Sequence, residues 1–241
     1  MQIGCLARYF NSYKEEVEFA QNGDFQFMQI WYDSNGISLK KDLKPIETIK
    51  KYDFPTIIHA VLDINEFEEH VPKLIEILKY LGHHELIIHP VCKSEEITPQ
   101  TIYKLSDKVR FALSELSKEN ITLYLENNSR LDPIFNQPNE LEIMFKQNPA
   151  LHFLLDIAHI DSYQHLKSMI AIKMPRILHI ADRHLEVIHE HLPIGQGNID
   201  YKYIFANVLK NFHGKMILEI VQSSSDIISS KAIIEEYCRI R

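Results

Sequence analysis

The sequence lacks the features that mark membrane and secreted chains. No apolar run in its 241 residues reaches the roughly 18 needed to span a bilayer. Residues 1–10 indicate a buried strand and have neither the basic nor the long apolar region of a secretory signal. Cys5, Cys92 and Cys238 lie far apart and form no CxxC pair, which excludes a disulfide framework and a cysteine zinc site. We therefore expect a soluble cytoplasmic protein that makes no contact with a membrane.

Positive charge and cofactor motifs are also scarce. The net charge is −7 with histidines neutral, which disfavours nucleic acid as a partner, although a local basic patch or bound cations would still permit it. There is no Walker A motif, and Gly195-Gln196-Gly197 lacks the third glycine of a dinucleotide fingerprint, so we expect no nucleotide cofactor. No nucleophile elbow surrounds the serines at 223–225, which disfavours a Ser/His/Asp hydrolase.

The sequence does contain a regular alternation of short apolar runs and longer amphipathic segments. The short runs are rich in Ile, Leu, Val and aromatic residues, as in parallel strands that are buried on both faces. We predict strands at 2–8, 26–32, 55–62, 84–90, 121–127, 151–157, 175–181 and 215–221.

The longer segments have helical periodicity. In 66–81, for example, Leu74 and Leu78 fall on one face, while Glu69 and Lys73 occupy the other. We predict helices at 12–22, 42–51, 66–81, 99–119, 138–147, 162–173, 200–212 and 226–239.

Strict alternation of strands and helices, without paired strands, predicts an all-parallel sheet. Because the unit repeats eight times, we predict closure into a (β/α)8, or TIM, barrel rather than an open doubly wound sheet. No linker rich in Pro, Gly or Ser divides the chain, so residues 1–241 are expected to form one domain. The longest stretch without a pattern runs from about 182 to 199, and such stretches are usually functional.

Histidines and carboxylates gather at the predicted carboxyl ends of the strands, which is where active sites of parallel barrels form. The residues that fall there, or in the loops just beyond, are His59, His89, Glu126, Asp156, His159, His179, His189, His191 and Glu219. A single such residue is more often a surface or capping group than a ligand. Solvated residues, however, would not select the same end of six consecutive strands.

The surroundings of these residues predict a divalent metal ion. Several lie inside apolar runs such as LYLEN, FLLDIAH and MILEI, where burying a carboxylate or an imidazole is costly unless something pairs with it. A cation is the natural partner, and mixed His, Asp and Glu ligation without thiolates suits Mn²⁺, Zn²⁺, Co²⁺, Mg²⁺ or non-haem iron. We place the site at Glu126, Asp156, His179 and Glu219.

The most specific motifs are LYLENN at 123–128, LLDIAH at 154–159, HIAD at 179–182, HLPIGQGNIDY at 191–201 and LEI at 218–220. Together they resemble the xylose isomerase-like barrels, which include sugar isomerases and epimerases and the class II apurinic endonucleases. The resemblance spans most of the chain.

The epimerase branch of that family implies one divalent ion held by the four residues of the predicted site. Glu126 and Glu219 would flank the substrate and act as acid and base on opposite faces, removing and returning a proton on a carbon next to a carbonyl. His159 would touch the substrate, and Arg183 falls near the position of a substrate-binding arginine.

The endonuclease branch implies a larger set of ligands that holds three zinc ions. His59, His89, His159 and His191 fall on the additional ligand positions of that branch. His189, however, stands where that branch has aspartate, the loop from 179 to 191 is shorter, and the DNA-gripping insertions and basic balance are lacking.

Asp182 and Arg183 complete the candidates for additional metal or substrate binding. We expect a metal-dependent isomerase or epimerase that acts on a sugar or a related small polyol by proton transfer between two glutamates. The alternatives are a zinc-dependent phosphodiester hydrolase acting at abasic DNA and a barrel that has lost catalysis, although the retained carboxylates argue against the latter. The sequence names neither the substrate nor the number of ions, and it leaves homo-oligomer formation open.

Overall fold

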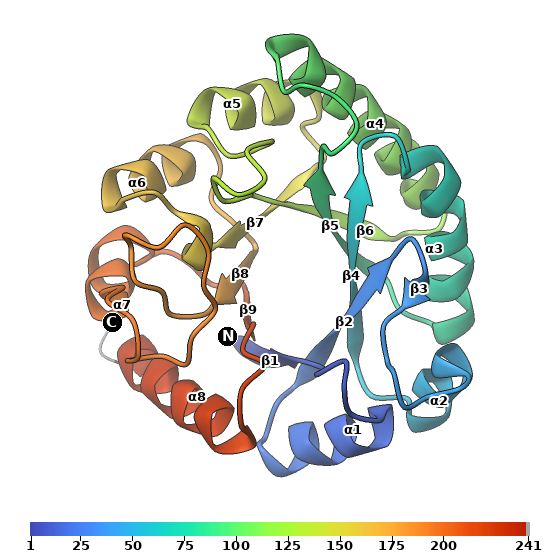
Figure 1. Cartoon of the computed structure of the whole chain (residues 1–241), viewed down its shortest axis with the longest axis vertical. Coiled ribbons are helices and arrows are strands. Elements are labelled where there is room, and N and C mark those ends of the chain that lie inside the picture. Colours follow the sequence, from blue (N-terminus) through green and yellow to red (C-terminus); the bar gives the residue numbers. More distant parts are fainter. Residues whose placement is uncertain (240–241) are drawn as a thin grey trace.

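The apolar runs form the strands of a closed barrel, seen end-on in Figure 1, in the computed structural model, which describes residues 1–239. Eight parallel strands follow the order β1-β9-β8-β7-β6-β5-β4-β2, and pairing of β1 with β2 closes the ring. They are β1 (Gln2–Leu6), β2 (Phe27–Asp33), β4 (Thr56–Asp63), β5 (Glu85–Val91), β6 (Thr122–Glu126), β7 (His152–Asp156), β8 (Ile177–Ile180) and β9 (Lys215–Leu218). The predicted (β/α)8 barrel is confirmed. The sequence did not predict β3 (Gly36–Ile37), which pairs antiparallel with the end of β2.

Helices surround the barrel and cover the outer faces of its strands (Figure 1). They are α1 (Tyr13–Asn22), α2 (Pro45–Tyr52), α3 (Phe67–Leu81), α4 (Pro99–Ser117), α5 (Pro138–Gln147), α6 (Tyr163–Ile172), α7 (Tyr201–Tyr203) and α8 (Ser224–Arg239). Local sequence fixes where several of them begin. Ser12 and Glu15 form a capping box at the start of α1, and Thr98 caps α4, whose first residue is Pro99.

The segment predicted as a helix at 200–212 folds differently. Asp200 caps α7 by accepting a hydrogen bond from the Tyr203 backbone, but after residue 203 the chain widens into a π-helical turn, η2 (Ile204–Val208). This turn places Ile204 and Phe205 in the core. A prediction based on helical periodicity does not anticipate such a change of pitch.

The inside of the barrel is divided into an apolar layer and a polar layer. The apolar layer lies toward the amino ends of the strands and consists of Phe27, Ile57, Ile87, Tyr124, Leu154, Ile177 and Ile217. Glycine is required at position 4, because a Cβ atom there would lie 2.5 Å from the Phe27 ring. The packed layer closes the middle of the barrel, so a ligand has room only at one of its two ends.

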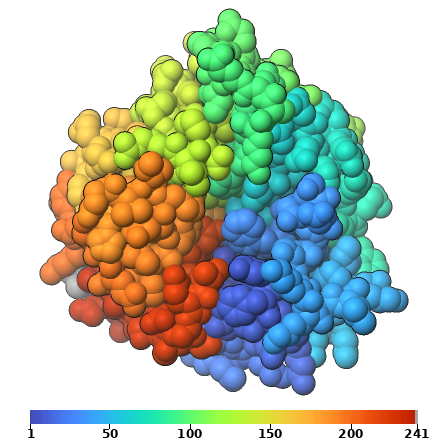
Figure 2. Space-filling model, in the orientation of Figure 1, coloured from blue at the N-terminus to red at the C-terminus, as the bar shows by residue number. Residues whose placement is uncertain are grey.

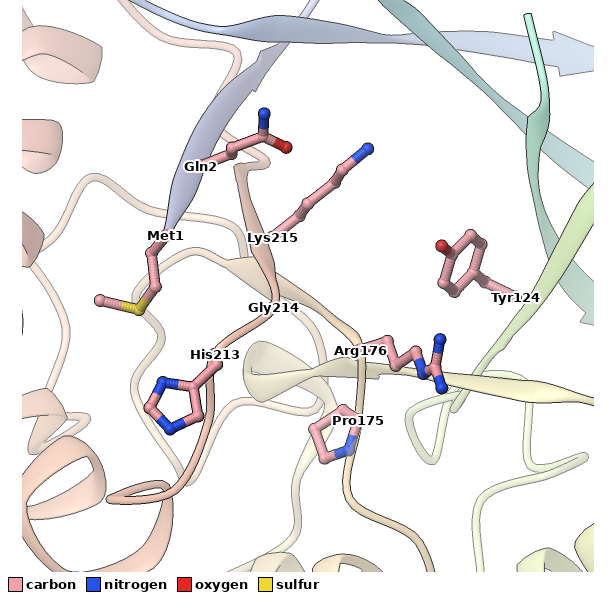
Figure 3. A pocket seen from close by; sticks show the side chains of 8 residues that line it. All are labelled: Met1, Gln2, Tyr124, Pro175, Arg176, His213, Gly214 and Lys215. Carbon is pink, nitrogen blue, oxygen red and sulfur yellow. The ribbon is translucent and has the colours of Figure 1, made fainter.

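At the amino end, the barrel opens into a cavity of about 540 Å³ whose lining includes Tyr124, Arg176, His213 and Lys215. Figure 3 shows Lys215 and Tyr124 extending into the same space. Both side chains bind Glu85: the Tyr124 hydroxyl donates at 2.8 Å, and the Lys215 ammonium forms an ion pair. None of the helices within residues 1–239 is long and apolar enough to cross a membrane.

At the carboxyl end, the loop after β8 forms a raised mass beside the centre of the ring, coloured orange in Figure 2. An antiparallel bridge between Asp182 and Leu192 pins this loop. The two glycines of the GQG sequence have separate roles. Gly195 has φ +92°, a conformation that L side chains rarely adopt, while a Cβ atom on Gly197 would lie 2.5 Å from the backbone nitrogen of Arg183.

Candidate metal centre

Six of the candidate histidines and carboxylates each lie two positions after a residue of the apolar layer that fills the barrel. The pairs are Ile57 and His59, Ile87 and His89, Tyr124 and Glu126, Leu154 and Asp156, Ile177 and His179, and Ile217 and Glu219. Because alternate residues of a strand share one face, each polar side chain points into the barrel just beyond the apolar layer. The strand period thus converts six distant sequence positions into one polar layer.

Glu126, Asp156, His179 and Glu219 converge in this layer. Each offers a ligand atom, and these atoms all lie within 4.8 Å of one another. The Nδ1 atom of His179 lies at the centre, 3.2 Å from Glu126 Oε1, 3.3 Å from Glu219 Oε2 and 3.8 Å from Asp156 Oδ2. All four side chains are buried. The structure therefore brings together the four residues that the sequence selected.

The donor set fits a divalent cation. The Asp156 carboxylate accepts a hydrogen bond from the Ala158 backbone through Oδ1, at 2.6 Å. Its other oxygen, Oδ2, is buried and has no hydrogen-bond partner among residues 1–239. A buried carboxylate oxygen without a donor is costly, and this one faces the imidazoles of His159, His179 and His191 at 3.4 to 3.8 Å. A cation beside Oδ2 would supply the missing partner.

The carboxyl groups of the site are held in their charged form. Burial raises the pKa of Glu126, but the imidazoles of His179, His89 and His59 outweigh it and bring the pKa well below its ordinary value. Burial also raises the pKa of Glu219. His179 and His191 outweigh this effect and bring the pKa well below its ordinary value. Ionised carboxylates are the form that binds a metal ion and accepts a proton from carbon.

The imidazoles of the site divide into two groups. Burial lowers the pKa of His179, but Glu219 and Glu126 overcome this effect and raise it well above the ordinary value; at His191, Asp156 and Glu219 act in the same way and raise the pKa to about 9. Burial lowers the pKa of His159. Without a cation, protons on His179 and His191 neutralise the carboxylates. A metal ion would take over that role.

His59 and His89 bind the far side of Glu126. The Nε2 atom of His59 lies 2.6 Å from Glu126 Oε2, and His89 Nδ1 lies 3.2 Å from the same oxygen. Ligand atoms of His59, Glu126 and His179 also lie within 4.8 Å of one another, so this flank offers a second metal-binding arrangement that shares Glu126. The buried Nδ1 atom of His59 has no hydrogen-bond partner within residues 1–239.

His159, His189 and His191 form a separate group whose ligand atoms lie within 4.8 Å of one another. His159 follows β7 in a short 3-10 turn, and the other two belong to the loop after β8. The Nε2 atoms of His191 and His159 are 3.4 Å apart. His189 is exposed, and its ring centroid lies 5.0 Å from the ring centroid of His191. This all-imidazole group suits a transition metal better than Mg²⁺.

Asp182 and Arg183 are not brought into the site. The Asp182 carboxylate accepts hydrogen bonds from the backbones of Arg183, Gly195 and Ile199. The Arg183 guanidinium is buried and donates to the carbonyls of Ile188, at 2.8 Å, and Ile160. Both side chains hold the loop after β8 in shape. The Nε atom of Arg183 is buried and has no hydrogen-bond partner among residues 1–239, and a contact of Arg183 with a substrate stays a prediction.

Sequence reasoning missed Gln29, which lies on β2 and is fully buried. Its amide nitrogen donates to Glu219 Oε1 at 3.0 Å, and its amide oxygen lies 2.7 Å from His179 Nε2. A signal existed, because Gln29 follows the barrel-filling Phe27 by two positions, as the other site residues follow theirs. Glutamine neither titrates nor commonly binds metals, so the search for ionisable strand ends overlooked it.

A cavity of about 170 Å³ opens onto this layer. Its wall consists of a polar part, with Glu126, Glu219 and five histidines, and an apolar part, with Leu6, Trp31 and Val221. The Trp31 ring meets His59 edge-on, with centroids 5.2 Å apart. No lysine or arginine of the described chain lines the cavity. The space therefore suits a small neutral molecule that offers hydroxyl or carbonyl oxygens to the polar wall and carbon to the apolar wall.

Solved structures of similar shape include sugar 3-epimerases and a zinc-bound protein. A D-tagatose 3-epimerase-like protein is 21% identical, with a TM-score of 0.75 over 100% of this chain and 98% of that chain. An L-ribulose 3-epimerase is 14% identical, with a TM-score of 0.77 over 100% and 95%. IolI protein with a bound zinc atom is 15% identical, with a TM-score of 0.75 over 100% and 99%. At these identities the likeness establishes the fold alone.

No curated protein sequence matches this chain significantly. The family model described as xylose isomerase-like TIM barrel matches residues 62–239, which is most of the chain and includes the five strands from β5 to β9 with the candidate ligands from His89 to Glu219. The resemblance seen in the strand-end motifs is thereby confirmed. The chain belongs to the xylose isomerase-like TIM barrel family.

Proposed function

We propose that this protein is a metal-dependent isomerase or epimerase of a small, uncharged sugar or related polyol. The single observation that carries the proposal is the convergence of three buried carboxylates on His179 Nδ1, with Glu126 and Glu219 both lining the cavity. Sugar 3-epimerases among the structures of similar shape support the choice of reaction class. The substrate is the proposed partner of the site.

The two glutamates are suited to share one proton transfer. They belong to β6 and the end of β9, approach His179 Nδ1 from two sides at 3.2 and 3.3 Å, and are ionised in the absence of substrate. One carboxylate removes a proton from the carbon next to the substrate carbonyl, and the other, after taking up a proton from solvent, delivers it to the opposite face.

Glu126, Asp156, His179 and Glu219 would hold the cation in this reaction. Bound there, a Mn²⁺, Zn²⁺, Co²⁺ or Mg²⁺ ion would polarise the carbonyl and hydroxyl oxygens of the substrate and so make the neighbouring C–H bond more acidic. His159 lines the cavity and is held by its Nδ1 atom, which lies 2.9 Å from the Asn127 carbonyl. A carbonyl oxygen only accepts, so Nδ1 carries the proton of the neutral ring, and Nε2 would accept a hydrogen bond from a substrate hydroxyl.

The cavity supports a small and unphosphorylated substrate. Its volume of about 170 Å³ is below the roughly 300 to 1,000 Å³ of pockets for drug-sized ligands. Its polar wall has three carboxylates nearby but no lysine or arginine from residues 1–239, so a phosphate group would meet no fixed positive charge from the chain. The apolar part of the wall, which includes Trp31, would bind the carbon face of a sugar.

The second candidate function is metal-dependent hydrolysis of phosphodiesters at abasic DNA. The observation that favours it is the additional group of His159, His189 and His191, together with the arrangement around His59, since clustered ions activate water and stabilise a leaving oxygen. The net charge of −7 and the lack of basic side chains around the cavity disfavour it.

Solvent exchange tests the proposal directly. The protein is loaded with Mn²⁺, Co²⁺ or Zn²⁺ and incubated in D₂O with a panel of free ketoses and polyol-derived ketones. A proton that passes through a carboxyl group exchanges with solvent, so the proposal predicts deuterium at one carbon of the true substrate and formation of its epimer or isomer. Metal content is measured on the same sample, and one ion per chain is expected.

The contrary outcome is equally specific. Full metal occupancy without deuterium in any member of the panel would overturn the isomerase assignment. If the loaded protein also carries two or three zinc ions and cleaves a duplex at an abasic site, with binding that weakens as salt rises, the second candidate replaces the first.

A further inference from the structure

Gln29 joins two of the candidate metal ligands that come from the opposite half of the chain. It lies on β2, fully buried, 150 positions from His179 and 190 positions from Glu219 in sequence. Its Nε2 atom is 3.0 Å from Glu219 Oε1, and its Oε1 atom is 2.7 Å from His179 Nε2. Both ends of this single amide therefore contact the metal centre.

Chemistry fixes the orientation of this amide. Gln29 Nε2 lies 3.0 Å from Glu219 Oε1, and a carboxylate oxygen that binds a cation only accepts hydrogen bonds, so the NH₂ end of Gln29 faces it. The amide oxygen then faces His179, and because that oxygen only accepts, His179 must carry a proton on Nε2. A reversed amide would place two acceptors against each other at 3.0 Å.

The fixed proton has a consequence for the other ring nitrogen. When His179 is neutral with its proton on Nε2, the lone pair lies on Nδ1. That atom is the one surrounded by Glu126, Asp156 and Glu219 at 3.2 to 3.8 Å. The amide also resists rotation of the imidazole ring, which would exchange the positions of its two nitrogens.

We propose that Gln29 is a positioning residue of the metal centre: by linking Glu219 to His179, its amide orients the His179 ring and one oxygen of Glu219 so that both can bind one cation. The inference rests on the proposed metal-dependent function. A purely structural glutamine would be expected to bind backbone groups, as Gln26 does with Ile3 at the other end of the strand. Both hydrogen bonds of the Gln29 side chain go instead to candidate ligands.

The test is metal affinity in the absence of substrate. Gln29→Met keeps the length of the side chain but removes both hydrogen bonds. Mn²⁺ is the probe, because its preference for carboxylate oxygen directs it to the four-residue site rather than to the three histidines. Removing the partner that orients a ligand typically costs about 10- to 100-fold in metal affinity, and we expect the Mn²⁺ dissociation constant, measured from free Mn²⁺ by electron paramagnetic resonance, to rise by that factor.

Gln26→Met is the matched control, because it makes the same substitution three positions earlier on the same chain segment but at the amino end of the barrel. Its Mn²⁺ affinity should stay within about twofold of the wild type. If Gln29→Met does not fold, Gln29→Asn replaces it. Asparagine keeps the amide but withdraws it by one methylene from both partners, so the Mn²⁺ affinity should fall by a similar factor.

Two failures are distinguishable. If the wild type binds Mn²⁺ and the folded variant binds it equally well, the positioning role is overturned, whatever happens to the thermal midpoint of the metal-free protein. If the wild type binds none of Mn²⁺, Zn²⁺ and Co²⁺, the metal-dependent function falls and this inference falls with it. Because no substrate enters the measurement, a missing isomerase activity does not affect its outcome.

Discussion

At the carboxyl end of the barrel, buried carboxylates surround the Nδ1 atom of His179. At the amino end, by contrast, Glu85 and Lys215 form a partly exposed ion pair. Asp156 and Glu126 are 0% and 1% exposed, and each faces several imidazoles. The side chains of Glu85 and Lys215 remain 26% and 27% exposed and satisfy each other. The amino-end cavity is the larger, at about 540 Å³ against about 170 Å³.

The difference shows that cavity size is a poor guide to function in this barrel. At the amino end, Glu85 forms an ion pair with Lys215 and accepts a hydrogen bond from Tyr124, so these three groups satisfy one another. At the carboxyl end, Asp156 Oδ2 has no hydrogen-bond partner within the described chain. A buried carboxylate oxygen without a hydrogen-bond partner is a stronger sign of a ligand than an open volume is.

The largest expected effect comes from Glu219→Gln, which removes one of the two proton-transfer groups and one ligand charge. Turnover of the substrate should fall by about 10²- to 10⁴-fold, with an unchanged circular dichroism spectrum. Glu85→Gln makes the same change at the amino end and should leave turnover within about twofold of the wild type. Full activity of the Glu219 variant would refute its acid/base role.

Removal of the metal from the carboxyl-end site should lower the stability of the folded protein. A ligand that is present at 1,000 times its dissociation constant stabilises the folded state by about 4 kcal/mol. For a chain of this size, a chelator should therefore lower the thermal midpoint by about 10 °C, measured by scanning calorimetry. Asp156→Asn, which weakens the metal site, should lose most of this response. A chelator effect that persists in that variant would place the metal elsewhere.

The apolar wall of the carboxyl-end cavity should contribute to substrate binding. Trp31→Ala removes the ring that lines this cavity and contacts His59 edge-on. An aromatic contact of this kind is worth about 0.5 to 1.5 kcal/mol, so KM should rise up to about tenfold while kcat changes little. Steady-state kinetics separates the two constants. A fall in kcat with unchanged KM would show instead that Trp31 positions His59.

The smallest effect is expected at the amino end. Lys215→Met removes the ion pair with Glu85 and the contact of the ammonium with the Phe27 ring, whose centroid lies 5.2 Å away. For a partly exposed pair this costs at most about 1 kcal/mol in the free energy of unfolding, measured by urea denaturation. Mn²⁺ affinity and turnover should not change. A loss of either would mean that the amino end takes part in function.

Much of the site was predictable because the rule that gathers it is simple. Glu126, Asp156 and His179 end apolar runs, and parallel strands bring their carboxyl ends to one rim. The loops were not predictable in the same way. Arg183 was expected near a substrate, but its guanidinium binds the carbonyls of Ile188 and Ile160. The direction of the Arg183 side chain depends on how the loop after β8 folds, and the alternation of residues along a strand does not determine the fold of a loop.

The sequence by itself determined the order of strands and helices and the level in the barrel at which each polar side chain lies, because alternation along a strand is a local property. Only the tertiary structure decided that Gln29 links His179 to Glu219, and that His159 meets two histidines of the loop after β8. The contacts of Gln29 join β2 to β8 and to the end of β9 and require the barrel to close through β1. Closure is set by the packing of the whole chain and leaves no mark in any one segment.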